Sequence, residues 1–230
     1  MSLKILLTPV AAVLAFFLSA AVIAEPAAPP VGADDLKLVK HTKLRAVYMK
    51  PGTNLAQYDK VALLGCYVAF KKDWQRNYND QTMNLMNRIT DQDMKNIREA
   101  LGKEFDKVFI EVLKKGGQEI VDRGGDGVLV IQPAILNLEV TAPDSLTAGM
   151  QANFSASAGQ MTLFMQLYDG KTGDMIARVI DPEAAGDDYF EVRNSVTNMA
   201  DADRIIRRWA TILSDHLSKI SAEPSSPAAQ

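Results

Sequence analysis

The chain has 230 residues, of which 47% are hydrophobic and 23% are charged, which is the composition of a globular protein and excludes general disorder. Its 25 basic and 28 acidic residues give a net charge of −3, which does not support nucleic-acid binding because that function usually needs a basic excess. The single cysteine, Cys66, excludes an internal disulfide, so the core alone must stabilise what the length predicts to be one sizeable domain.

Residues 1–24 have the pattern of a bacterial secretory signal peptide. Lys4 precedes an uncharged apolar run, and small residues stand before a predicted cleavage site after Ala24. Retention of the run as a membrane anchor is the alternative, because it is nearly long enough to span a bilayer. No cysteine lies near the junction, so we expect a non-lipidated chain in the periplasm.

Residues 25–43 are predicted to form a flexible leader, which begins with a Pro- and Ala-rich stretch. The segment 36–50 that overlaps its end is basic. A solvated face is the simpler interpretation of these charges, and weak contact with anionic lipid headgroups is the alternative for an exported chain. A short strand is expected over Leu44–Met49, before a Pro-Gly pair that ends it.

The run Lys60–Phe70 predicts a central buried strand, because it is apolar at successive positions and carries one charge at its start. Cys66 lies in this run and is expected to be a buried, unreactive thiol. The polar segment Lys71–Asp80 follows, with Trp74 and Tyr78 among basic residues. A loop over an edge of the core is the simpler interpretation, and a binding surface is the alternative that makes these two aromatic residues candidate partner contacts.

An amphipathic helix is predicted over residues 84–115. Thr90 and Asp93 form a near capping box, and apolar residues follow at helical spacing. Gly116 and Gly117 are expected to end the helix through a left-handed cap.

Strand patterns follow over Glu119–Val121 and Val128–Thr141, and Pro133 in the second predicts an edge position or a bulge. The small, polar segment 142–157 shows little periodicity and predicts a long loop. Partner contact and disorder both remain open for this loop. Met150 and Phe154 are its candidate partner-contact residues.

The segment 158–181 predicts a β-hairpin. Alternate apolar positions place one buried face on its first strand, and the second strand returns over Met175–Ile180. The polar run between them contains Gly173, which can take a positive φ in a turn closed by a bulge. A short edge strand is expected over Tyr189–Val192, and an amphipathic helix over Met199–Ile220. Three arginines of this helix face away from its apolar stripe and are expected in solvent; they are Arg204, Arg207 and Arg208.

No set of residues in the sequence predicts catalysis, a metal site or a cofactor. His41 and His216 have neither metal-ligand spacing nor a neighbouring nucleophile motif. Asp169 and Asp174 bracket the hairpin turn, where local side-chain to backbone bonding is favoured over a weak calcium site. Calcium loops need oxygen ligands at alternate positions, and lysine and glycine occupy those positions here.

Several segments occur together in a recognisable order. They are Arg45–Gly52 with Leu55 and Tyr58, the strand opened by Ala158-Gly159 that ends in Tyr168–Asp174, and Trp209-Ala210 in the last helix. This order resembles the bacterial envelope family called domain of unknown function 3313, over roughly residues 44–220. Most members of that family are predicted lipoproteins, whereas this chain lacks the lipidation cysteine. The resemblance implies no catalytic residues.

We therefore expect an α+β fold over residues 44–220, with a mixed, mostly antiparallel sheet packed by two long amphipathic helices and a disordered tail over 221–230. The expected function is a non-enzymatic, partner-binding domain of the periplasm whose partner is an envelope protein. Membrane contact is expected only through an uncleaved signal or the basic N-terminal segment. A small-ligand carrier or an unrecognised hydrolase with a pocket near the 142–157 loop is the alternative, which a concave apolar pocket would favour and a flat exposed patch would not.

Overall fold

The computed structural model of the protein describes residues 35–83, 85–140, 153–155, 160–184, 191–193 and 195–222. The predicted signal peptide over 1–24, most of the leader over 25–43 and nearly all of the tail over 221–230 lie outside these residues.

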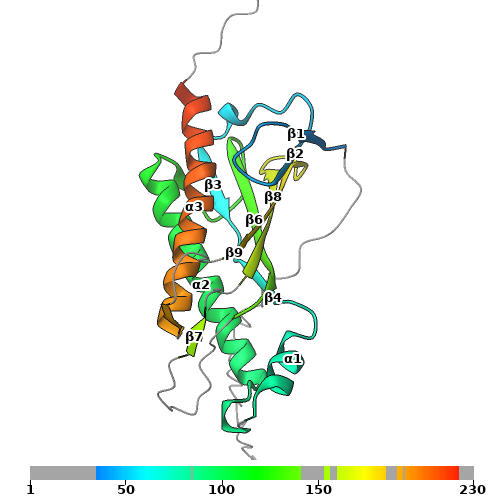
Figure 1. The fold of residues 1–230 in the computed structure, drawn as a ribbon. Coiled ribbons are helices and arrows are strands. Elements are labelled where there is room, and N and C mark those ends of the chain that lie inside the picture. The colour runs from blue at the N-terminus through cyan, green and yellow to red at the C-terminus, as the bar shows by residue number, and fades with distance from the viewer. Residues whose placement is uncertain are drawn as a thin grey trace, which may run out of the picture.

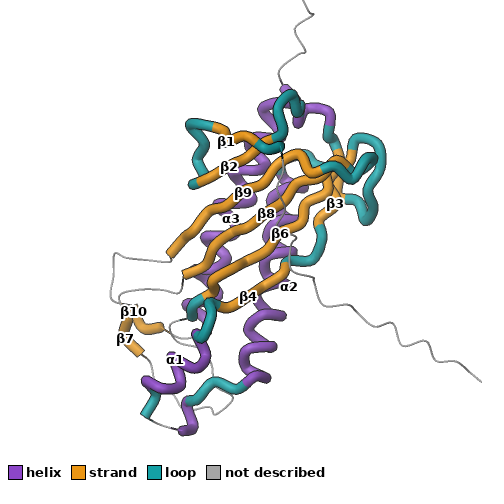
Figure 2. The backbone as a smooth tube through the Cα atoms, turned by 90° about the vertical axis from the view of Figure 1, so that its right-hand side faces the viewer, coloured by secondary structure: helices purple, strands orange, loops and turns teal. Residues whose placement is uncertain are grey.

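One eight-stranded sheet forms the centre of the described structure, in the order β1-β2-β9-β8-β6-β3-β5, with β4 also pairing with β6. Its strands are β1 (Lys37–Val39), β2 (Ala46–Met49), β3 (Lys60–Leu63), β4 (Tyr67–Phe70), β5 (Glu119–Ile120), β6 (Val128–Leu138), β8 (Gln160–Asp169) and β9 (Met175–Ala184). Helices α2 (Asp91–Lys115) and α3 (Ser195–Ala222) lie together on one face of the sheet (Figures 1 and 2). This arrangement confirms the predicted α+β fold with its mixed, mostly antiparallel sheet.

The predicted hairpin is formed by β8 and β9, which pair antiparallel along their whole length. The alternating apolar residues of β8 are buried against the helices, as the pattern predicts; they are Met161, Leu163, Met165 and Leu167. In the turn, the Asp169 carboxylate accepts the backbone N–H groups of Lys171 and Thr172 at 2.9 and 2.8 Å. Gly173 has a φ of 76°, a value that glycine adopts without steric cost.

The apolar run 60–70 forms two short strands, β3 and β4, so the prediction of a single central strand was wrong. Both strands pair in parallel with β6, and the chain leaves the sheet between them. Pro133 of β6 lies opposite this break, because β3 pairs only as far as Ile131 and β4 begins at Ala134. Of the edge position or bulge predicted from the proline, the edge position was wrong. Pro133 pairs with Met165 of β8 on one side, and its missing N–H is tolerated because no described strand pairs with it on the side of β3 and β4.

Helix α2 begins at Asp91, seven residues later than the predicted start at position 84. The capping box sets this boundary, because the Thr90 side chain accepts the Asp93 N–H and the Asp93 carboxylate accepts the Thr90 N–H. A short 3₁₀ turn, η2 (Leu85–Asn87), occupies the preceding residues. At the other end Gly117 has a φ of 91°, which confirms the predicted left-handed cap.

Helix α3 packs against both α2 and the sheet. Its buried stripe includes Ile206, Trp209 and Leu217, as its periodicity predicts. Gly116 at the end of α2 allows the two helices to approach closely, because a Cβ there would lie 1.9 Å from the Ser214 hydroxyl oxygen. The described core is therefore a layer of apolar side chains between the two helices and one face of the sheet.

Three short strands differ from the sequence expectations. Strand β1 lies inside the predicted leader 25–43 and pairs with β2, because its backbone groups complete the exposed edge of that strand. Strand β7 (Asn153–Ser155) lies in the predicted 142–157 loop and pairs with β10 (Glu191–Arg193), close to the edge strand predicted over Tyr189–Val192.

Candidate functional site: an arginine-lined groove on helix α3

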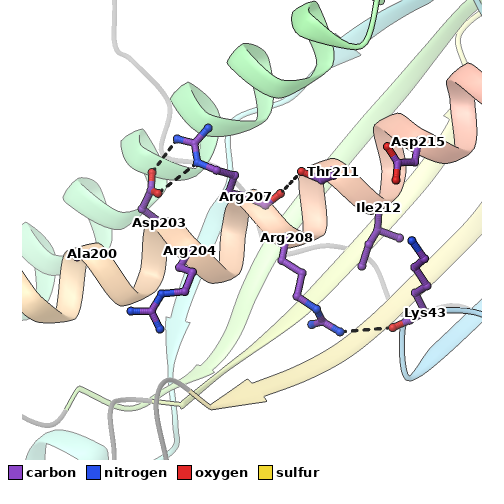
Figure 3. A pocket seen from close by; sticks show the side chains of 9 residues that line it. All are labelled: Lys43, Ala200, Asp203, Arg204, Arg207, Arg208, Thr211, Ile212 and Asp215. Atoms are coloured by element: carbon purple, nitrogen blue, oxygen red, sulfur yellow. Dashed lines mark hydrogen bonds and ion pairs between the residues drawn. The ribbon is translucent and has the colours of Figure 1, made fainter. Parts of the chain in front are cut away.

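A groove of about 930 Å³ runs along the solvent side of α3. The residues that line it are Lys43, Ala200, Asp203, Arg204, Arg207, Arg208, Thr211, Ile212 and Asp215. All except Lys43 come from α3 (Figure 3). Spacings of three and four residues place side chains on one side of a helix, which is how a single element supplies nearly the whole lining.

The charge of this lining is mainly positive, with four cationic and two anionic side chains. Arg207 points towards α2, where its guanidinium lies 3.3 Å from the Glu111 carboxylate and 3.1 Å from that of Asp203 (Figure 3). Hydrogen bonds from Lys115 and then from Arg207 lower the pKa of the Glu111 carboxyl. These pairs fix the direction of the Arg207 guanidinium and tie α3 to α2.

The Arg208 side chain extends away from that of Arg207, towards the sheet (Figure 3). Its guanidinium contacts the Glu183 carboxylate and lies 3.4 Å from that of Asp181, and it also donates to the Lys43 carbonyl at 3.4 Å. Asp181 is 3% exposed and accepts the Trp209 indole N–H at 2.8 Å. The buried Asp181 therefore connects β9, α3 and the segment that carries Lys43.

The remaining cations are more open to solvent. Arg204 pairs with Asp201 at the base of its own helical turn, and its side chain is 67% exposed. Lys43 is exposed and its side chain faces Ile212 and Asp215 in Figure 3. Because a guanidinium carries five N–H donors, an arginine that holds one internal carboxylate can still donate to an external one.

The lining offers the hydrogen-bond donors of four cationic side chains to anions. No histidine or cysteine lines the groove, and the Thr211 hydroxyl donates to the Arg207 carbonyl at 2.7 Å. Among the described residues, no group of three or more His, Cys, Asp or Glu side chains could hold a metal ion. The groove thus offers oriented donors for carboxylate or phosphate groups, without a base and nucleophile pair of the kind that acyl transfer uses.

Two of the sequence-predicted contact residues, Trp74 and Tyr78, do not line this groove. Trp74 and Tyr78 lie on helix α1 (Trp74–Gln81), where a loop was expected. Trp74 is 8% exposed and stacks between Phe70 and Tyr78, with ring centroids 4.8 and 5.5 Å away. This burial places Trp74 at the edge of the core, which was the simpler interpretation of the segment.

The other two predicted contacts lie in or near the 142–157 loop. Met150 is outside the described residues, and Phe154 stands in β7, where its backbone pairs with Val192. The pocket expected near this loop in the alternative hypothesis also falls mainly outside the described residues.

Cys66 is 4% exposed, which confirms the predicted buried thiol. Burial and then the neighbouring Asp106 raise the pKa of the thiol well above its usual value. The Cys66 backbone N–H donates to the Asp106 carboxylate at 3.1 Å, and burial raises the pKa of Asp106 to about 6. The thiol is therefore protonated at neutral pH and its role is packing.

The sequence interpretation missed the groove because it assigned the arginines of α3 to solvent. The spacing of Arg204, Arg207 and Arg208 was the available signal, since it places all three near one another on the helix surface. No local pattern could have added Lys43, which is more than 150 positions away in the chain. In the described part of the chain, no helix is long and apolar enough to cross a membrane.

Comparisons with known proteins give a family and several weak structural likenesses. The sequence model of the family described as "Protein of unknown function (DUF3313)" matches residues 34–213. A search of curated protein sequences found no match.

The solved structures that resemble the fold include a PelC dodecamer from Paraburkholderia phytofirmans, at 13% identity and a TM-score of 0.36, covering 72% of this chain and 96% of that one. They also include a minor lipoprotein from Acinetobacter baumannii, at 14% identity and a TM-score of 0.34, covering 73% of this chain and 98% of that one. At these TM-scores neither likeness bears on the function.

Proposed function

The chain belongs to the DUF3313 family of proteins of unknown function, and from that premise we propose that it is an exported, non-enzymatic domain of the bacterial cell envelope that binds a protein partner through the α3 groove. The partner presents acidic side chains to the groove. The signal-peptide pattern over residues 1–24 supports export to the periplasm.

The observation that carries this proposal is that four cationic side chains line one open groove. They come from two segments far apart in the sequence, so folding is needed to bring them together. Arg207 and Arg208 are held in fixed directions by carboxylates on α2, α3 and β9. Side chains that are already ordered lose less entropy when a partner binds, which favours recognition at this surface.

The shape and the chemistry of the groove support binding over catalysis. It is open along the helix, and its one hydroxyl group is engaged with the backbone of α3. Acidic side chains of a partner would meet two or more guanidinium groups, which bind carboxylates in a planar, two-point geometry.

The test is chemical crosslinking in intact cells, followed by identification of the captured envelope proteins. We compare the native chain with a variant carrying Lys43→Glu and Arg204→Gln, which changes the charge of the groove by three units. Both side chains are exposed, so the fold should tolerate the changes. Arg123→Glu is the control for reversing a surface charge, because Arg123 is exposed and lies outside the groove.

We expect the native chain and the control to capture the same partner, and the groove variant to capture it about tenfold less, which corresponds to roughly 1.4 kcal/mol. Thermal unfolding of each variant checks that the fold is intact. Equal capture by all three chains would refute the assignment of the groove. Only nonspecific capture, together with a small molecule that raises the melting temperature, would refute the partner-binding function and favour a ligand carrier.

A further inference from the structure

The end of the molecule that carries α1 presents an apolar tip, made of Met83, Leu85 and Met86. Their exposed fractions are 101%, 72% and 63%, the highest of any large apolar side chains among the described residues. Single exposed apolar residues are ordinary in soluble proteins, whereas a contiguous group of them marks an interaction surface.

The base of the tip is fixed by side-chain hydrogen bonds. The Asn79 amide donates to the Ile89 carbonyl at 2.9 Å and accepts the Ile89 N–H at 2.7 Å, so it joins the two ends of the segment. Gln75 also donates to the Ile89 carbonyl at 3.0 Å, and Ile89 itself is 2% exposed. The fold therefore holds the tip in an exposed position, between the end of α1 and the start of α2.

The backbone N–H groups of Thr82 and Arg88, which flank the tip, are paired within the segment. The Thr82 N–H donates to Asn79 at 3.3 Å and its hydroxyl donates to Tyr78 at 2.8 Å, while the Arg88 N–H donates to Leu85 at 3.4 Å across η2. Backbone groups that are paired within a segment can enter a poorly hydrated environment at a lower cost.

The tip itself carries no charge, and charged residues flank it on both sides in the sequence. Residues 81–87 carry no charged side chain, and the nearest charges along the chain are Asp80 and Arg88. Tyr78 lies at the base of the tip, half-buried against Trp74. Tyrosine with an apolar ring and a polar end is the residue type that collects at the boundary between lipid headgroups and acyl chains.

The area of the tip distinguishes a lipid surface from a protein partner. Three side chains of this size expose on the order of 400 Å², about half of the roughly 800 Å² that each partner buries in a stable protein interface. Such interfaces also centre on aromatic or arginine anchors; the tryptophan here is buried in the fold, and Arg88, which is exposed, lies at the margin of the apolar side chains. A bilayer requires neither the larger area nor a directional partner.

We propose that the apolar tip inserts Met83, Leu85 and Met86 into the headgroup–acyl boundary of a lipid bilayer. The three side chains contain about as many apolar groups as one myristoyl chain, which gives weak and reversible membrane binding with an association constant of about 10⁴ M⁻¹. The tip thus acts as a reversible membrane contact, separate from the α3 groove, from the signal-peptide pattern over residues 1–24 and from the basic segment 36–50.

The test is quenching of a fluorescent label by brominated lipid in vesicles of zwitterionic phosphatidylcholine. The full chain carries an environment-sensitive label at Met83→Cys, and Leu64→Cys is the control because Leu64 is an exposed apolar residue away from the tip, at 44%. Cys66 is buried, so the native chain treated with the same reagent measures background labelling. Brominated lipid quenches only a label that lies within the bilayer. Membrane attachment through another part of the chain therefore does not by itself quench the label at position 83.

We expect the label at position 83 to lose at least half of its fluorescence and the label at position 64 to lose little. Adding Leu85→Ser and Met86→Ser to the position 83 chain should reduce the quenching several-fold, with an unchanged melting temperature. Equal quenching at both positions, or none at position 83, would overturn the proposal. Self-association or capture of a protein through the tip without quenching would overturn it as well. Lys43→Glu with Arg204→Gln should leave the quenching unchanged, which separates this test from that of the groove.

Discussion

The buried carboxylate of Asp181 offers the sharpest test of how the fold builds the groove. It accepts the Arg45 backbone N–H at 2.7 Å and the Trp209 indole N–H at 2.8 Å, and Arg208 approaches it at 3.4 Å. Asp181→Ala removes the acceptor and leaves the indole N–H of a side chain that is 1% exposed without this partner.

The expected cost follows from these contacts. Hydrogen bonds to a charged group contribute about 1.5–3 kcal/mol each, and a buried donor left without its acceptor costs a further 1–3 kcal/mol. Arg208 is 45% exposed and can be rehydrated, so it adds little. We expect Asp181→Ala to lower the free energy of unfolding by at least about 4 kcal/mol.

Urea unfolding followed by circular dichroism measures this loss, and a double-mutant cycle assigns it. Trp209→Phe removes the donor and keeps most of the ring, so the cycle with Asp181→Ala should give a coupling energy of about 1.5–3 kcal/mol between the two side chains. A loss below about 1 kcal/mol, or a coupling energy near zero, would show that Asp181 does not hold α3 to the sheet.

Other contacts give predictions of smaller size. Tyr58→Phe should cost about 1 kcal/mol in urea unfolding, because it removes the 2.8 Å hydrogen bond to Asp169. Burial and that bond raise the pKa of Tyr58 to about 12. The free energy of unfolding of the native chain should therefore fall as pH rises from about 10 to about 12, and that of the Phe variant should fall less. The same decrease in both chains would contradict this. Burial raises the pKa of Asp106 to about 6, so the free energy of unfolding should fall as pH rises from about 4 to 6. The decrease should be on the order of 1 kcal/mol, because Asp106 is partly accessible to solvent. Asp106→Asn should remove most of this pH dependence. Gly124→Ala should lower the melting temperature because its Cβ would lie 2.6 Å from a backbone carbonyl oxygen, whereas the control Gly125→Ala meets nothing nearer than 3.9 Å and should be nearly neutral.

These contacts also explain the motif residues that carry the family resemblance. Tyr58 donates to Asp169 across the hairpin turn, and Gly170 lies so close to Val128 that a Cβ would come within 2.6 Å of its carbonyl oxygen. Trp209 reaches Asp181 from α3. The motif is therefore a set of structural contacts, and it identifies the fold without identifying an activity.

Local periodicity predicted the hairpin and the two long helices because each buries one continuous apolar face. The same reasoning placed Leu85 and Met86 inside a helix that in fact begins at Asp91, so it hid the apolar tip. The capping box at Thr90 already contained the correct boundary. A stronger weight on capping chemistry than on apolar spacing would have left these residues in an exposed turn.

The groove could not be predicted from local sequence patterns, because segments far apart in the chain form it. Lys43 reaches α3 because β2 pairs with β9 and because Asp181 binds both the Arg45 amide and Trp209. The break between β3 and β4 has the same origin, since Cys66 bonds to a side chain of α2 in place of a neighbouring strand. Long-range pairing of this kind is set by the tertiary fold, which overrides the propensity of a short apolar run.

Site-specific photo-crosslinking in intact cells tests partner binding through the groove most directly. A photoreactive residue at Thr211, which is exposed on the groove, is compared with one at Lys103, which is exposed on α2. The proposal predicts one discrete envelope-protein adduct from position 211, none from position 103, and loss of the adduct when Lys43→Glu and Arg204→Gln are added. The same adducts from both positions, or an adduct that survives the charge changes, would contradict it.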